Sequence, residues 1–179
     1  MNKLILLDRD GVINQDSMNY IKSVDEFFPI SGSIEAIARL TKAGYRIGVA
    51  TNQSGIARGY YSEDILAAIH SKMLNLVHEA GGEITGIEYC KHMPDSGCFC
   101  RKPQPGMLLS LAERMGCSLA NVSFVGDRVS DIEAAEAAGA TPIMVLSQMT
   151  DRLSLQDNKP YVPVFDSLSL YVDHLLESE

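Results

Sequence analysis

Tryptophan, long apolar runs and an excess of positive charge are all missing from this chain of 179 residues, and aromatic side chains make up only 7% of it. No apolar run approaches the length of a membrane-spanning helix. The apolar stretch of the amino-terminal segment is too short for a signal peptide. In the cytoplasm the four cysteines are expected to be reduced, so a cluster of them favours a metal site over a disulfide framework. We therefore expect a cytoplasmic protein with reduced cysteines and no membrane partner.

The deficit of positive charge leaves a formal net charge of −8 at pH 7. A strongly acidic domain is a poor match for a phosphate backbone, so nucleic acid is not expected as a partner. A small anionic substrate is compatible with this charge only if cations are concentrated locally. The length suits one domain with a sizeable core, and we expect residues 1–179 to form a single domain that acts as a monomer.

Short apolar runs alternate with amphipathic segments along the chain. The runs expected to be strands cover 3–8, 45–51, 84–90, 122–127 and 141–146. The segments expected to be helices cover 31–44, 62–82, 105–116, 130–139 and 166–179. Ser62 is the expected N-cap of the second helix, and Ser130 or Asp131 that of the fourth. The alternation predicts an α/β fold with a central parallel sheet covered on both faces.

Polar side chains follow the expected strands at their carboxyl ends. They are Asp8 with Asp10, Thr51 with Asn52, Cys90, and Asp127. Ligands of parallel α/β sheets bind beyond the carboxyl ends of the strands. We therefore expect these side chains to meet at one edge of the sheet and to form the functional site.

The first of these motifs, Asp8-Arg9-Asp10-Gly11, can carry phosphoryl chemistry. A carboxylate can attack phosphorus to form an aspartyl phosphate, and a second carboxyl can exchange protons with the leaving oxygen and with water. A D-x-D-G motif also opens calcium loops. The residues that follow lack the further acids and the closing Glu of such a loop, which excludes the calcium interpretation.

Further acids and donors come from later motifs. Asp127 and Asp131 add carboxylates whose mutual repulsion a hard cation such as Mg²⁺ would offset, although Asp131 could equally serve as a helix cap. The hydroxyl and amide groups of the segment 51–54 could hold phosphate oxygens. Lys102 could balance the carboxylates and stabilise charge during transfer.

In this order, the motifs resemble the four motifs of the haloacid dehalogenase (HAD) superfamily of phosphotransferases. They comprise Asp8-x-Asp10, Thr51, Lys102, and Gly126-Asp127 with Asp131. The resemblance implies a Rossmann-like three-layer sandwich. It also implies that Asp8 is the nucleophile, that Asp10 is the general acid/base, and that Thr51 and Lys102 hold the phosphoryl group.

The same resemblance implies a Mg²⁺ site formed by Asp8, the backbone carbonyl of Asp10, and Asp127, with Asp131 supporting it. No insertion between the motifs is long enough for a separate cap domain, so an open site is expected.

Longer stretches resemble one branch of this superfamily, the D-glycero-D-manno-heptose 1,7-bisphosphate 7-phosphatase family. They are DRDGVIN, TNQSGIARGYY, CRKPQPGML and the Cys/His loop. The resemblance implies removal of the C7 phosphate of a sugar bisphosphate in ADP-heptose and lipopolysaccharide synthesis. It assigns substrate contacts to Asn52, Gln53, Ser54, Arg101 and Arg128. Segment 16–20 reads DSMNY where the family usually has D-x-G-Y, and its contacts are left open.

The loop over residues 90–100 carries a separate motif. Cys90 and His92 are one residue apart, as are Cys98 and Cys100, and residues i and i+2 of an extended chain point to the same side. A closed set of three cysteines and one histidine predicts a structural Zn²⁺ site. Metal binding would order a loop with little apolar content and would thereby anchor Arg101 and Lys102.

Two alternatives stay open. Histidinol-phosphate phosphatases share the short Cys/His loop, although TNQSGIARG favours the heptose branch. A receiver-like signalling domain also places acids, a threonine and a lysine at the edge of a parallel sheet. Against the receiver, the second acidic cluster of this chain comes last, and Asp10 offers a general base that would shorten the life of a phosphorylated aspartate.

Overall fold

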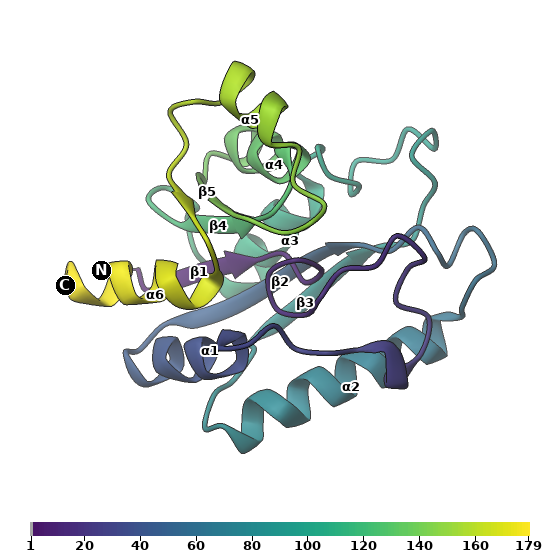
Figure 1. The fold of residues 1–179 in the computed structure, drawn as a ribbon, viewed down its shortest axis with the longest axis horizontal. Helices are drawn as coiled ribbons and strands as arrows, with labels where there is room; N and C mark the ends of the chain where they lie inside the picture. The colour runs from purple at the N-terminus through teal and green to yellow at the C-terminus, as the bar shows by residue number, and fades with distance from the viewer. Residues whose placement is uncertain (1) are drawn as a thin grey trace.

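A computed structural model describes residues 2–179 and contains a six-stranded parallel sheet in the order β3-β2-β1-β4-β5-β6 (Figure 1). The strands are β1 Leu4–Leu7, β2 Arg46–Asn52, β3 Gly86–Cys90, β4 Ser123–Gly126, β5 Thr141–Val145 and β6 Val164–Phe165. The α/β class and the parallel sheet are confirmed, and β6 is an addition to the five predicted strands.

The helices that connect the strands also lie where the sequence predicts them. They are α1 Ser33–Lys42, α2 Glu63–Glu79, α3 Gly106–Met115, α4 Val129–Ala138 and α6 Leu168–Glu177. The helix α5 Arg152–Asn158 and the short 3-10 helix η1 Val24–Glu26 were not predicted. Within residues 2–179, no helix combines the length and hydropathy needed to cross a bilayer.

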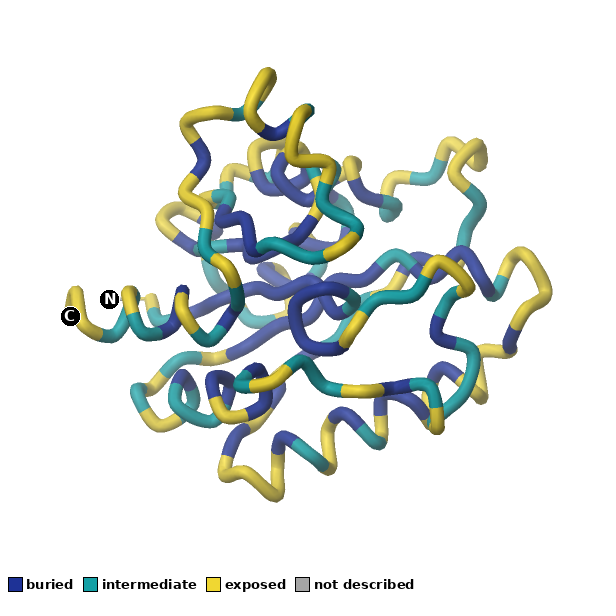
Figure 2. Tube along the Cα trace, in the orientation of Figure 1, coloured by how far each residue is buried: buried dark blue, intermediate teal, exposed yellow. Residues whose placement is uncertain are grey.

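Two apolar layers cover the sheet, as the alternation of side chains in β1 shows. Ile5 and Leu7 pack into one core with α1, α2 and α6, whereas Leu4 and Leu6 pack into a second core with α3 and α4. Successive residues of a strand point to opposite faces, so a strand that is buried throughout needs helices on both sides. The buried strands between the two helical layers form a three-layer sandwich (Figure 2).

The N-terminus of α4 corrects the expected cap. Neither Ser130 nor Asp131 is the N-cap, because the helix begins at Val129 with Arg128 in the capping position. Asp131 lies inside the first turn, where its Oδ2 accepts hydrogen bonds from the backbone N–H groups of Arg128 (3.0 Å) and Asp127 (3.1 Å). A carboxylate that satisfies these otherwise unpaired donors lets the helix start earlier. By contrast, Ser62 caps α2 as predicted.

Candidate active site

The residues expected at the site surround one pocket of about 700 Å³ at the carboxyl ends of the strands. Those that line it are Asp8, Asp10, Thr51, Asn52, Gln53, Ser54, Arg101, Lys102, Arg128 and Asp131. Asp127 is adjacent to this group, because a carboxylate oxygen of Asp127 lies within 4.8 Å of those of Asp8 and Asp131. The fold therefore brings the side chains that follow the strands together at one edge of the sheet, as the sequence predicts.

Lys102 is the cation at the centre of this cluster and is only 4% exposed. Its Nζ lies 2.9 Å from Asp8 Oδ1 and 2.8 Å from Asp131 Oδ1. Burial alone would lower the pKa of Lys102, but the carboxylates of Asp131 and Asp8 raise it above its ordinary value. The lysine therefore stays charged and balances two of the buried acids.

The side chain of Asn52 forms two hydrogen bonds with the backbone of Lys102. Its Nδ2 donates to the carbonyl of Lys102, and its Oδ1 accepts from the backbone N–H of Lys102, both at 3.1 Å. The lysine Nζ also donates to the carbonyl of Ala50 at 2.9 Å. The carboxamide of Asn52, for which a substrate contact was expected, is thus engaged in positioning Lys102.

The single positive charge of Lys102 does not balance all three carboxylates of Asp8, Asp127 and Asp131. Burial, and then the charge of Asp131, raise the pKa of Asp8 well above its ordinary value and that of Asp127 to about 7. Asp127 Oδ1 is buried and has no hydrogen-bond partner among residues 2–179. A buried carboxylate oxygen without a partner is costly, and a hard divalent cation suits such oxygen ligands. The donor set therefore fits Mg²⁺.

Asp10 sits in a different environment. Arg9 is fully buried, and its Nε (3.0 Å) and Nη2 (2.8 Å) both donate to Asp10 Oδ1; Asn14 Nδ2 donates to the same oxygen at 2.9 Å. Burial alone would raise the pKa of Asp10, but Arg9 and the amide donors hold it below its ordinary value. Arg9 in turn donates through Nη1 to His70 Nε2 at 3.1 Å.

The roles of Arg9 and His70 were not predicted. A cation between two acids in the motif DRD was a signal for Arg9. The sequence offered no signal that could pair the buried His70 with a residue so far away in the chain.

Gln53 links Asp10 to Thr51. Its Nε2 donates to Thr51 Oγ1 at 2.9 Å and to Asp10 Oδ2 at 3.3 Å. The hydroxyl of Tyr61 donates to Gln53 Oε1, which decides the direction in which the amide points. Gln53 is buried, and its amide is thus engaged within the protein. Tyr61, which sequence reasoning missed, fits against Gly55, where any Cβ would lie 2.2 Å from its ring.

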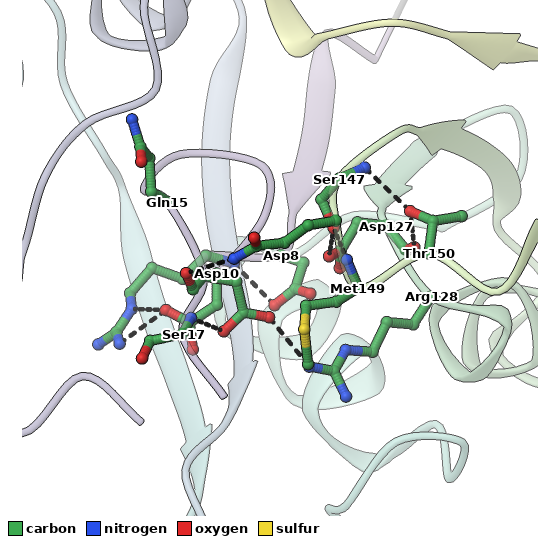
Figure 3. Close-up of polar contacts among 12 residues, drawn as sticks. Asp8, Asp10, Gln15, Ser17, Asp127, Arg128, Ser147, Met149 and Thr150 are labelled. Carbon is green, nitrogen blue, oxygen red and sulfur yellow. Dashed lines mark hydrogen bonds and ion pairs between the residues drawn. The ribbon is translucent and has the colours of Figure 1, made fainter. Parts of the chain in front are cut away.

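Three arginines surround the outer part of the pocket. Arg101 has a buried Nη1 without a hydrogen-bond partner within residues 2–179, and Arg58 is a lining residue that was not predicted. Arg128 Nη2 pairs with Asp16 Oδ2 at 2.9 Å, which gives segment 16–20 a contact at the site. Anionic groups of a ligand would find these cations in the same pocket as the carboxylates, and Figure 3 shows Arg128 beside them.

The cysteine and histidine side chains of the Cys/His loop converge on one point and form a second candidate metal site. The ligand atoms of Cys90, His92, Cys98 and Cys100 lie within 4.8 Å of one another. Cys90 Sγ is 3.7 Å from Cys98 Sγ and 3.0 Å from Cys100 Sγ, and His92 Nδ1 is 3.2 Å from Cys100 Sγ. Two thiolates on one tetrahedral zinc ion are about 3.8 Å apart, from a Zn–S distance of about 2.3 Å. The Cys90–Cys98 separation fits this value, whereas the Cys90–Cys100 separation would have to lengthen when the four side chains hold one ion.

A buried strand-end aspartate beside a lysine and two further carboxylates, on this order of parallel strands, is the arrangement of a hydrolase of the HAD superfamily. In agreement, a family model described as HAD-hydrolase-like matches residues 99–170. The chain belongs to the family of D-glycero-β-D-manno-heptose-1,7-bisphosphate 7-phosphatases, as full-length relatives show.

The relatives with this name include one from Pseudomonas putida, 51% identical over 97% of this chain and 99% of its own length. Another, from Pseudomonas aeruginosa, is 49% identical over 97% of this chain and 98% of its own length. A crystal structure of D,D-heptose 1,7-bisphosphate phosphatase from Bordetella bronchiseptica, complexed with magnesium and phosphate, has a TM-score of 0.92, at 44% identity and 99% coverage of both chains.

Proposed function

We propose that this protein hydrolyses the C7 phosphate of D-glycero-β-D-manno-heptose 1,7-bisphosphate, in the synthesis of ADP-heptose for lipopolysaccharide. The observation that carries the proposal is the buried Asp8 between Lys102 and the unpartnered oxygen of Asp127, in a chain whose full-length relatives carry this activity in their names. The arginines around the pocket suit a substrate with two phosphates.

Asp8 is the proposed nucleophile. Its Oδ1 is held by the backbone N–H of Arg9 (2.7 Å) and by Lys102 Nζ (2.9 Å), which leaves Oδ2 to attack phosphorus. The bond from phosphorus to the C7 oxygen breaks, and the sugar leaves with a proton from Asp10. Water then attacks the aspartyl phosphate, Asp10 accepts a proton from that water, and inorganic phosphate is released.

The environment of Asp10 suits the second step directly, because its lowered pKa keeps it ready to accept a proton. For the first step it must carry one. The negative charge of a bound phosphate raises the pKa of a neighbouring carboxyl, so binding of the substrate itself would favour the protonated acid.

The proposed ligands of Mg²⁺ are Asp8, the backbone carbonyl of Asp10, and Asp127, and Mg²⁺ is present in the Bordetella bronchiseptica structure. When bound, the ion would neutralise the carboxylates and the phosphoryl oxygens. Asp131 supports this group without binding the metal, since its two oxygens are already occupied by Lys102 and by the backbone N–H groups of Asp127 and Arg128.

The remaining site residues are proposed to hold the substrate. Thr51 and Lys102 would hold the phosphoryl group, while Asn52, Gln53 and Ser54 shape the wall beside them. Arg101 and Arg128 would receive the phosphate that stays on the sugar, and the buried unpartnered Nη1 of Arg101 supports this role.

The second proposed cofactor is Zn²⁺, bound by Cys90, His92, Cys98 and Cys100. The convergence of three sulfur atoms and one nitrogen atom within 4.8 Å supports one tetrahedral ion with no open position. Because Cys100 directly precedes Arg101 and Lys102, a metal that fixes the loop also fixes both cations. We further propose that residues 1–179 act as one monomeric domain in the cytoplasm.

A panel assay tests the proposed function. We would measure phosphate release from heptose 1,7-bisphosphate, fructose 1,6-bisphosphate and histidinol phosphate, with and without Mg²⁺. The expected result is Mg²⁺-dependent turnover that favours the heptose substrate and disappears in Asp8→Asn. Preference for histidinol phosphate would instead identify the protein as a histidinol-phosphate phosphatase. Normal turnover by Asp8→Asn would refute the aspartyl-phosphate route.

A further inference from the structure

Asp127 is held at three of its four polar groups by other residues. Its backbone N–H donates to Asp131 Oδ2 at 3.1 Å. Its carbonyl accepts from Thr150 Oγ1, and its Oδ2 accepts from Ser147 Oγ, both at 2.7 Å (Figure 3). Only Oδ1, buried and without a partner among residues 2–179, is left for a ligand.

The two hydroxyls come from one turn after β5, the 147–150 turn, whose internal bonds direct their protons. The backbone N–H of Met149 donates to Ser147 Oγ, and that of Ser147 donates to Thr150 Oγ1, both at 3.0 Å. Each hydroxyl oxygen thus already accepts a hydrogen bond. Since a hydroxyl has one proton to donate, each proton is directed to Asp127.

Gly11 packs closely against the same carboxylate. A Cβ at Gly11 would lie 2.0 Å from Asp127 Oδ2, and the glycine has a φ of +83°. The carboxylate is thus confined between Gly11 and Ser147. Confinement of this kind reduces the reorganisation that a ligand must undergo when its metal binds.

We propose that Ser147 and Thr150 are positioning residues for the divalent cation: they hold Asp127 so that Oδ1 alone is presented to Mg²⁺. This inference rests on the proposed role of Asp127 as a metal ligand. Neither hydroxyl touches substrate in this scheme. Their removal therefore weakens Mg²⁺ binding, whereas turnover at saturating Mg²⁺ is largely kept.

The test measures Mg²⁺ binding itself, by titration calorimetry on full-length protein dialysed against Mg²⁺-free buffer so that any zinc is retained. Ser147→Ala is expected to raise the dissociation constant of Mg²⁺ roughly tenfold, at the low end of the effect of removing such supporting contacts. Ser147→Thr keeps the hydroxyl and is expected to stay within about twofold of the unmodified protein on the same grounds. Thr150→Val, which removes the other hydroxyl without loss of volume, is expected to weaken binding in the same direction.

Ser123→Ala is the matched control. Ser123 lies on β4, the strand that leads to Asp127, and its hydroxyl forms one hydrogen bond, to Tyr171 at 2.7 Å. Its loss is expected to lower the melting temperature without changing Mg²⁺ affinity. Equal Mg²⁺ affinity of Ser147→Ala, Thr150→Val and the unmodified protein would overturn the inference while leaving the proposed function intact. If the unmodified protein itself bound no Mg²⁺, the proposed function would fail as well.

Discussion

At the scale of single residues, His70 is a buried imidazole that must stay neutral. Arg9 Nη1 donates to its Nε2 at 3.1 Å, so a proton on that nitrogen would face a donor. Burial, and then the charge of Arg9, lower the pKa of His70 to about 3. The histidine therefore accepts from the arginine that orients Asp10, which connects the proposed general acid to the helix α2.

This pKa predicts a loss of stability in acid. The unfolded chain takes up a proton on His70 as pH falls through about 6.5, whereas the folded protein does not until about pH 3. Stability is therefore fully present above pH 6.5 and falls between these values, by up to about 1.4 kcal/mol per pH unit from this group. Denaturant unfolding from pH 7 to 4 should show a shallower decline in His70→Gln. His78→Gln, which removes an exposed imidazole from the same helix, is the control, and an equal slope in His70→Gln and the unmodified protein would contradict the assignment.

A second residue-scale prediction concerns Tyr61, which fixes the amide of Gln53. Tyr61→Phe frees that amide to rotate away from Thr51 and Asp10 without removing any atom that touches substrate. One hydrogen bond contributes about 1 kcal/mol, so we expect kcat to fall about fivefold with little change in KM. Tyr60→Phe is the matched control because Tyr60 is an exposed neighbour. An unchanged kcat in Tyr61→Phe would show that the amide needs no such support.

At the scale of elements, the Cys/His loop is expected to act through the chain that follows it. Cys98→Ser should lower bound zinc, measured by mass spectrometry, and reduce kcat/KM because Arg101 and Lys102 lose their anchor. No catalytic atom changes in this variant. Cys117→Ser, a change at the one cysteine outside the loop, should retain both zinc and activity. A zinc-free Cys98→Ser protein with full activity would separate the loop from catalysis.

Elements with a strong local signal were predictable, and those that depend on distant partners were not. The buried strands carry unbroken apolar runs, and Ser62 and Gly116 mark helix ends by their own chemistry. In contrast, α5 is short and buries only Leu155, and β6 has two residues whose pairing depends on β5. Neither carries enough periodicity to be recognised.

The same distinction applies to the site. The acids and Lys102 stand in short motifs at strand ends, where chemistry and position coincide. Ser147 belongs to no motif, and its role depends on a hydrogen bond to Asp127, which follows another strand. Tyr61 ends the stretch TNQSGIARGYY, but the sequence does not show that its hydroxyl reaches Gln53. Gln53 was expected to bind substrate, but only the packed structure shows that its amide is engaged by Tyr61, Thr51 and Asp10.

At the scale of the whole molecule, metal binding should be linked to folding. A ligand that binds only the folded state at one hundred times its dissociation constant adds about 2.7 kcal/mol to the free energy of unfolding. We expect Mg²⁺ to raise the melting temperature of the unmodified protein but not that of Asp127→Asn. Without Mg²⁺, Asp127→Asn should be the more stable protein at pH 8, because the raised pKa of Asp127 means that its charge opposes folding there. Scanning calorimetry of both proteins, with and without Mg²⁺, measures both expected differences in stability.

The placement of β1 between β2 and β4 affects the order in which the parts of the site are synthesised. β1 is made first, yet Ile5 pairs with Ser123, so most of the chain separates the two partners. Asp8 is thus synthesised long before Asp127 and the turn that holds it. A nascent chain that ends before β4 carries the proposed nucleophile without the carboxylates of Asp127 and Asp131. Chains arrested before that strand lack the proposed metal ligand Asp127 and are therefore expected to release no phosphate from sugar phosphates.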